Sequence, residues 1–223
     1  MSVRAGDGLP TPLTFPEGYT SLIAVDIVSF GAPERDEAIQ AQLRQLMYVR
    51  LRKAFEITCL PWLACYVEDR GDGALIVLPP DVPAYLLLDP LAHHLKAVLR
   101  HGNRLYSRAL QMRLRVAVNA GFVHRDAYGV VGHAVNHLFR FLDAPAFKEA
   151  ISLSEAEVGL IVSDRLYGDV AGSGGYVDQA QYRPVQVVCK ETKADAHVWL
   201  SRTSVPEPWA ADPRDEREAD PAR

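Results

Sequence analysis

The apolar positions of the chain fall into runs of two kinds, and these predict the secondary structure. SLIAVDIVSF, at 21–30, is mostly apolar and β-branched, which is the pattern of a buried strand. Between 34 and 57 apolar residues recur at roughly helical spacing with Arg and Gln between them, which predicts a long amphipathic helix. ACYVEDR and GALIVLP then flank a Gly-Asp-Gly segment. We expect a hairpin with a tight turn there, because glycine permits a positive φ.

The later part of the chain continues this alternation. Helical periodicity returns at 89–105 and at 133–151, with a strand pattern at 114–124 between them. VGLIVSDRLYGDV, at 158–170, begins as a strand and becomes a short helix, and YRPVQVVCK with HVWL closes the domain as a hairpin. The predicted order is β-α-β-β-α-β-α-β-α-β-β. One hairpin after the first helix indicates an α+β fold of the ferredoxin-like kind, with a mostly antiparallel central sheet and flanking helices.

The two ends of the chain lack such patterns. Residues 1–19 are rich in Pro, Gly and Thr, which predicts a flexible arm, and the charge, Pro and Ala of 203–223 predict a disordered tail. The domain is therefore expected at 20–202. A formal net charge of -4 argues against a general nucleic-acid binder, and no segment approaches the ~18 apolar residues of a membrane span. We expect a cytoplasmic protein with neither nucleic acid nor membrane as a partner.

Two aspartates interrupt the pattern in a way that suggests a metal site. Asp26 lies inside the apolar strand, where a lone carboxylate is costly unless a cation or a donor meets it. Asp72 lies in the Gly-Asp-Gly turn, where an aspartate is more often a turn residue than a ligand. A β-α-β-β order makes the two strands neighbours, so their carboxylates can converge. Converging carboxylates suit a hard cation such as Mg²⁺ or Mn²⁺.

Four segments taken together resemble one known family. AVDIVSF, EDRGDGALIVLP, LRVAVNAGFVH and GVVGHAVNHLFR, in this order, are similar to the catalytic domain of the class III nucleotidyl cyclases, the adenylate and guanylate cyclase family, over about residues 20–200. The resemblance implies an enzyme that converts a nucleoside triphosphate into a 3′,5′-cyclic nucleotide and pyrophosphate. It also implies two divalent metal ions, Mn²⁺ or Mg²⁺, as cofactors.

The resemblance assigns roles to individual residues. Asp26 and Asp72 would bind the metal ions, with the backbone carbonyl of Ile27 as a further ligand. Asn136 would orient the ribose, and Arg140, four residues later on the same helix face, would stabilise charge on the α-phosphoryl group. The family geometry also implies a homodimer, since the aspartates come from one chain and the Asn-Arg pair from the other. A chain that carries both halves fits two symmetric shared sites.

Three further positions concern the substrate. Lys193 corresponds best to the triphosphate-binding lysine of the family, and Lys190 is the competing position. The two base-reading positions of the family fall on Glu68 and Gly129. Glu68 could accept hydrogen bonds from guanine, which favours GTP over ATP, whereas Gly129 supplies no side chain.

A pyrimidine substrate is the third option, and we favour it slightly over GTP. In its size and its incomplete purine reader the chain resembles the stand-alone bacterial pyrimidine cyclases of antiphage (Pycsar-like) systems, which make cyclic UMP or cyclic CMP for a separate effector. Arg70 and Tyr128 are nearby candidates for reading a smaller base. A catalytically silent nucleotide-binding regulator is an alternative. The chain departs from the family at Gly129 and Gly31, but it keeps both metal aspartates and the Arg, whose loss would support that alternative. A different metal-dependent phosphoryl-transfer enzyme is the other alternative, and the lack of a GGDEF-like run disfavours it.

Overall fold

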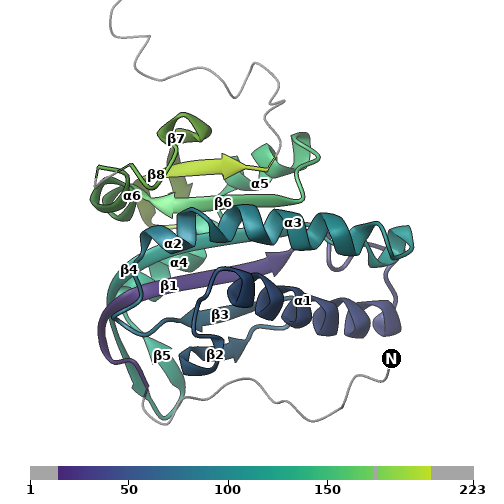
Figure 1. Cartoon of the computed structure of the whole chain (residues 1–223), viewed down its shortest axis with the longest axis horizontal. Coiled ribbons are helices and arrows are strands. Elements are labelled where there is room, and N and C mark those ends of the chain that lie inside the picture. The colour runs from purple at the N-terminus through teal and green to yellow at the C-terminus, as the bar shows by residue number, and fades with distance from the viewer. Residues whose placement is uncertain (1–14, 173–174, 202–223) are drawn as a thin grey trace, which may run out of the picture.

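The computed structural model describes residues 15–172 and 175–201 (Figure 1). Residues 1–14, 173–174 and 202–223 lie outside this range, and with them most of the expected N-terminal arm and the whole expected C-terminal tail. Within the described residues no helix combines the length and the apolar character that a membrane crossing requires.

One mixed sheet forms the centre of the described region. Its strand order is β2-β3-β1-β4-β6-β8-β7, and β5 pairs with β4. Each of the strands β2, β3, β1 and β4 runs antiparallel to its neighbour, whereas β6 is parallel to β4. This order is that of the expected ferredoxin-like unit, so the α+β prediction is confirmed. The strands are β1 (Gly18–Ile27), β2 (Tyr66–Asp69), β3 (Gly73–Val77), β4 (Leu114–Asp126), β5 (Gly129–Val131), β6 (Val158–Ser163), β7 (Tyr182–Cys189) and β8 (Thr192–Leu200).

The helices cover both faces of this sheet. In Figure 1, α1 and α3 lie in front of the sheet, and α4 lies behind it. The α-helices are α1 (Glu37–Ile57), α2 (Tyr85–Leu88), α3 (Leu91–Asn103), α4 (His133–Leu142), α5 (Pro145–Leu153) and α6 (Asp164–Ala171). The 3₁₀ helices are η1 (Trp62–Ala64), η2 (Arg108–Leu110) and η3 (Gln179–Gln181).

Two apolar cores follow from the alternation of side chains along β1. Ile23 and Val25 point into the core under α1 and α3, whereas Leu22 and Ala24 point into the core under α4 and α5. Successive side chains of a strand point to opposite faces, so Asp26 shares the α4 face with Leu22 and Ala24. A strand that is apolar on both faces is thus explained by helices on both sides of the sheet.

Several elements differ from the sequence prediction, among them the helix expected at 133–151 and the strand expected at 21–30. The single helix expected at 133–151 is two helices, because α4 ends at Leu142 and α5 begins at Pro145. Proline lacks the N–H that a continuing helix needs and is well placed at the first position of a new one. The expected strand at 21–30 spans Gly18–Ile27 instead, and the chain turns away soon after, with Ser29 at a φ of 55°.

Candidate active site

The ends of β1 and β3 bring Asp26 and Asp72 to adjoining positions. Asp26 is paired with Gly73 in the register of the two strands, and the N–H of Ile27 donates to the carbonyl of Asp72 at 3.0 Å. Asp26 is 8% exposed, whereas the Asp72 side chain is partly open to solvent. The neighbouring strands that the element order predicted are therefore present, and two carboxyl groups flank the same strand end.

Glycine is required on one side of this turn for space and on the other for backbone conformation. A Cβ on Gly73 would lie 2.1 Å from the carbonyl oxygen of Val25, which no side chain tolerates. Gly71 has a φ of 83° but open space around it. The close approach at Gly73 is what holds the Asp72 turn against β1.

Arg115 holds the buried aspartate. It faces Asp26 across the β1–β4 pair, and its Nε and Nη2 donate to the two carboxylate oxygens at 2.7 and 2.6 Å. Burial raises the pKa of Asp26 above its ordinary value, and the Arg115 hydrogen bonds oppose that rise only in part. Sequence reasoning missed Arg115. A charged residue between two apolar ones in the strand LRVAV was the available signal.

The oxygen ligands at this strand end fit a hard cation that takes most of its other ligands from water and substrate. They are two carboxylates and the carbonyl of Ile27, all oxygen ligands. No cluster of three or more His, Cys, Asp or Glu residues suited to a metal occurs in the described part of the chain. Mg²⁺ is commonly held by one or two carboxylates together with waters and substrate phosphates, so this set suffices if a triphosphate supplies the rest. Asp26 would have to exchange Arg115 for the cation.

Asn136 and Arg140 lie one turn apart on α4, and the side chain of Arg140 is only 21% exposed. Asn136 is exposed, and the Nη2 of Arg140 pairs with Oε1 of Glu191 at 2.6 Å. Glu191 sits in the turn between β7 and β8, and its side chain is 76% exposed. Such an exposed carboxylate holds its arginine weakly. The described contacts thus join Arg140 to Glu191 and not to the two aspartates.

The two expected base-reading positions adjoin each other. A Cβ on Gly129 would lie 3.4 Å from Oε2 of Glu68. Both oxygens of Glu68 are already engaged, Oε1 by Arg70 at 2.8 Å and Oε2 by the hydroxyl of Tyr66 at 3.1 Å. The guanidinium of Arg70 also lies over the ring of Phe139, 5.1 Å from its centroid. Glu68 is therefore part of a cluster with Arg70 and Tyr66, each of which contacts one of its two oxygens.

The third acid of the β2–β3 turn has a different partner. Asp69 accepts hydrogen bonds from Arg44 and from the hydroxyl of Tyr48, each at 2.7 Å, and from the N–H of Gly71. Burial would raise the pKa of Asp69, but these hydrogen bonds outweigh it and hold the pKa below its ordinary value. Arg70 and Arg44 of the same chain thus pair with the carboxylates of Glu68 and Asp69, respectively.

Neither candidate lysine joins these groups. Lys193 lies on β8, where Ala194 and Ala196 point into the core under α4, so the register puts Lys193 on the opposite face of the strand. Lys190 lies in the β7–β8 turn with a φ of 52°. The residue of this turn that contacts α4 is Glu191. Tyr128, a candidate for reading the base, is 97% exposed.

Comparison with known proteins supports the fold. No protein-family model matches the sequence, and no curated protein matches it. A bacterial light-regulated adenylyl cyclase matches in structure with a TM-score of 0.57 and 9% identity, over 86% of this chain and 95% of that one. An adenylate/guanylate cyclase/hydrolase from Silicibacter pomeroyi matches with a TM-score of 0.56 and 17% identity, over 82% and 96% of the two chains.

A third match was solved with a nucleotide. The guanylate cyclase domain of RhGC from Catenaria anguillulae, in complex with GTP, matches with a TM-score of 0.54 and 16% identity, over 84% of this chain and 98% of that one. At such identities the likeness concerns the fold. The chain therefore has the α+β fold of the class III adenylate and guanylate cyclase catalytic domains.

Proposed function

We propose that the protein is a nucleotidyl cyclase, which converts a nucleoside triphosphate into a 3′,5′-cyclic nucleotide and pyrophosphate. The observation that carries this proposal is the junction of Asp26 and Asp72 at the adjoining ends of β1 and β3. A cyclase fold with two carboxylates at this strand end has the oxygen ligands that a metal-bound triphosphate needs.

The roles proposed for individual residues follow from their chemistry. When bound, two divalent ions would polarise the triphosphate and favour attack by the ribose 3′-oxygen on the α-phosphorus. Asp26, Asp72 and the carbonyl of Ile27 would hold these ions. Asn136 would orient the ribose through its amide, and Arg140 would donate to the α-phosphoryl oxygens as negative charge develops there.

We propose a homodimer with shared sites as the working form. Arg140 on α4 pairs with the exposed Glu191, while the aspartates flank the end of β1. A second chain that brought its own α4 against the aspartates would complete the site, and the exposed Glu191 could give up Arg140 to a phosphoryl group at little cost. Lys193 or Lys190 would bind the triphosphate, although neither joins these groups within one chain.

The cluster around Glu68 supports the proposed choice of base. Arg70 pairs with Glu68 through one nitrogen, and we propose that its remaining N–H donors meet the base. Such donors suit carbonyl oxygens, of which uracil has two, cytosine and guanine one each, and adenine none. This count favours UTP, and the incomplete purine reader at Gly129 favours either pyrimidine over GTP, so we propose UTP or CTP ahead of GTP, with ATP least favoured. Gly129 leaves room but adds no contact.

The wider biological role is an extension of this proposal. Resemblance to the stand-alone bacterial pyrimidine cyclases supports a cytoplasmic enzyme whose cyclic nucleotide activates a separate effector during phage infection. The genes beside the coding sequence would test this role independently of the chemistry.

Product analysis tests the proposed activity directly. The purified full chain is incubated with Mn²⁺ and, separately, with ATP, GTP, CTP and UTP, and the products are resolved by mass. We expect a cyclic monophosphate and pyrophosphate from UTP or CTP, and neither from an Asp72→Asn control. No cyclic product from any nucleotide with folded protein would refute the enzyme. Nucleotide binding without turnover would favour the silent regulator.

A further inference from the structure

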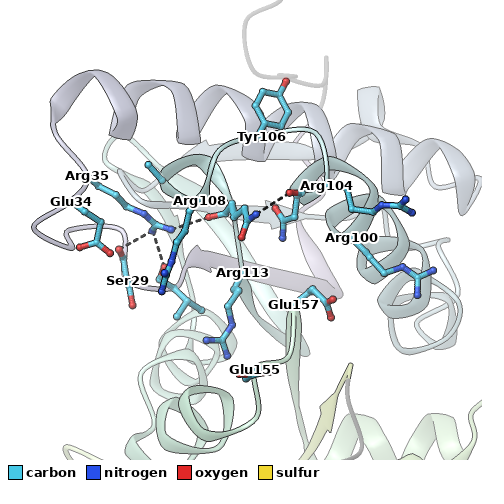
Figure 2. Close-up of a pocket in the computed structure, with 14 residues that line it drawn as sticks. Ser29, Glu34, Arg35, Arg100, Arg104, Tyr106, Arg108, Arg113, Glu155 and Glu157 are labelled. Carbon is cyan, nitrogen blue, oxygen red and sulfur yellow. Dashed lines mark hydrogen bonds between the residues drawn. The ribbon is translucent and has the colours of Figure 1, made fainter.

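A cavity of about 970 Å³ opens at the end of the sheet where β1 ends and β4 begins (Figure 2). Its walls come from the residues after β1, the end of α3, the segment around η2 and the residues before β6. None of the site residues proposed above lines it. We call it the arginine cavity, and its lining residues are Val28, Ser29, Glu34, Arg35, Arg100, Asn103, Arg104, Tyr106, Arg108, Ala109, Gln111, Arg113, Glu155 and Glu157.

Two of its five arginines have structural roles. Arg35 donates to three backbone carbonyls, those of Val28, Ser29 and Gln111, at 2.8–3.0 Å. Arg113 donates through Nε to a carbonyl of the segment before β6 at 2.8 Å. These two arginines fasten the loops that form the cavity, so their hydrogen-bonding capacity is largely used.

The other three arginines are uncommitted. Arg100, Arg104 and Arg108 are exposed, and none of their side chains forms an ion pair or a hydrogen bond with another residue of the described region. In Figure 2, Arg100 and Arg104 lie toward one end of the cavity and Arg108 lies toward the other. An anion that meets both ends must therefore carry negative charge at more than one position.

A buried guanidinium lies behind the same wall. Arg50 is 4% exposed and donates to the Oδ1 of Asn103 at 3.1 Å, while its Nη2 is buried with no hydrogen-bond partner in the described residues. It also lies over Tyr106, 5.7 Å from the ring centroid. Both Asn103 and Tyr106 line the cavity. A buried cation without a carboxylate partner is costly, and a nearby bound anion would offset that cost.

We propose that the arginine cavity binds a small oligoanion, of the pyrophosphate or tripolyphosphate class. Arg100, Arg104 and Arg108 would donate charge-assisted hydrogen bonds to it, and Arg50 would add positive potential from behind Asn103. The cavity lies between loops and has a volume of about 970 Å³, so a small anion fits it better than an extended polyanion such as nucleic acid or a lipid surface.

Occupancy of the cavity would regulate the site proposed above. Val28 and Ser29 line the cavity and directly follow Ile27, whose carbonyl is a proposed metal ligand. A bound anion would restrain this short segment, so the cavity and the metal ligands are coupled through the backbone. The regulatory step rests on the proposed cyclase activity, but the binding step does not.

Calorimetry on the full chain tests binding without any turnover. Tripolyphosphate, pyrophosphate and inorganic phosphate are titrated separately in the presence of EDTA, which removes metal-dependent binding at the aspartates. We expect affinity to fall in that order, because only the longer anions reach both ends of the cavity. Combined Arg100→Gln, Arg104→Gln and Arg108→Gln substitutions should weaken tripolyphosphate binding at least about tenfold.

Two control variants distinguish this site from other cationic surfaces. Arg183→Gln, which removes an exposed charge on β7, and Arg140→Ala, which alters the proposed nucleotide site, should each leave the affinity within about twofold. Hydrogen exchange at residues 28–31 should slow when tripolyphosphate is bound. Loss of binding in Arg140→Ala but not in the triple variant would overturn the proposal, as would no binding by the unaltered chain or preferential binding of oligonucleotides or anionic vesicles.

Discussion

Arg115 of β4 donates hydrogen bonds to both carboxylate oxygens of Asp26 on β1, at 2.7 and 2.6 Å. The side chain of Arg115 is only 15% exposed, and that of Asp26 only 12%. The pair occupies the position where a metal ion is proposed to bind. In the absence of a cation, Arg115 supplies the positive charge that a buried carboxylate needs. Cation binding would therefore be an exchange of one positive partner for another.

Removal of Arg115 should make stability depend on metal. Arg115→Met leaves Asp26 as an unpaired buried charge, so we expect a loss of about 3 kcal/mol in the free energy of unfolding. Urea unfolding measures this loss, and Mn²⁺ should recover part of it in the variant and little in the unaltered chain. The double variant Asp26→Asn with Arg115→Met should be more stable than Arg115→Met alone. If the single and the double variant lose the same free energy of unfolding and Mn²⁺ changes neither, Arg115 acts by packing alone.

The two glycines of the β2–β3 turn predict a matched pair of effects. Gly73→Ala would force a Cβ to within 2.1 Å of the Val25 carbonyl, so the strand must move. We expect a loss of about 3 kcal/mol or more in unfolding free energy and a loss of cyclase activity, because Asp72 moves away from β1. Gly71→Ala places its Cβ in open space, so the only cost comes from the positive φ at this position. We expect it to lower the free energy of unfolding by about 1 kcal/mol. Similar losses in both variants would contradict the close-approach argument.

Much of the fold could be predicted from the chain because its signals are local. The β-branched run of β1, the glycine turn and the helical spacing of α1 each lie within one segment, and the element order then fixes Asp26 beside Asp72. The break at Pro145 also had a local signal, but the apolar periodicity that continues through it concealed the break. A local signal therefore predicts an element best where no second signal overlaps it.

The partners of the charged residues could not be predicted in the same way. Arg115 meets Asp26 through the register of β1 with β4, residues 89 apart in the chain. The face on which Lys193 lies depends on where β8 begins, which was expected at 197 and occurs at Thr192. Register and strand limits arise from the packing of the whole sheet, so no single segment encodes them.

Asp69 predicts a component of acid sensitivity. Its pKa is lowered in the folded state, so its stabilisation is present above the unfolded value of about 3.8 and is lost as the pH falls through the lower folded pKa. Asp69→Asn should lower stability at pH 7 by about 2 kcal/mol, since the hydrogen bonds from Arg44 and Tyr48 lose their charged acceptor. Urea unfolding between pH 2 and pH 7 should therefore show a shallower decline at the acid end for the variant.

A surface control accompanies the acid series. Glu56→Gln removes an exposed carboxylate paired with Lys53, whose side chain is 54% exposed. Its effect on the unfolding free energy should stay within about 0.5 kcal/mol at every pH. If Asp69→Asn behaves like this control, the contacts of Asp69 with Arg44 and Tyr48 do not stabilise the fold.

Arg70 is expected to set the choice of nucleotide. Arg70→Ala removes the donors proposed to meet the base carbonyls and frees Oε1 of Glu68. We expect kcat/KM for the preferred nucleotide to fall about tenfold or more, with relative preference moving toward GTP because Oε1 of Glu68 no longer has a positively charged partner. Lys53→Ala, on the exposed face of α1, serves as the charge control and should leave the preference unchanged. An unchanged ranking of the four nucleotides in Arg70→Ala would remove Arg70 from the base site.

Subunit mixing tests the shared site. Asp72→Ala and Arg140→Ala chains should each be inactive alone, since each breaks both sites of its own homodimer. In a mixed dimer one site combines the intact Asp72 of one chain with the intact Arg140 of the other, while the second site carries both defects. Random association in an equal mixture makes half of the dimers mixed, so activity should return to about one quarter of that of the unaltered chain. A mixture of Asp72→Ala with Asp26→Ala chains is the control and should stay inactive, because both defects lie in the same half-site. Recovery in the control, or none in the test mixture after exchange of subunits is verified by mass, would refute a site built from two chains.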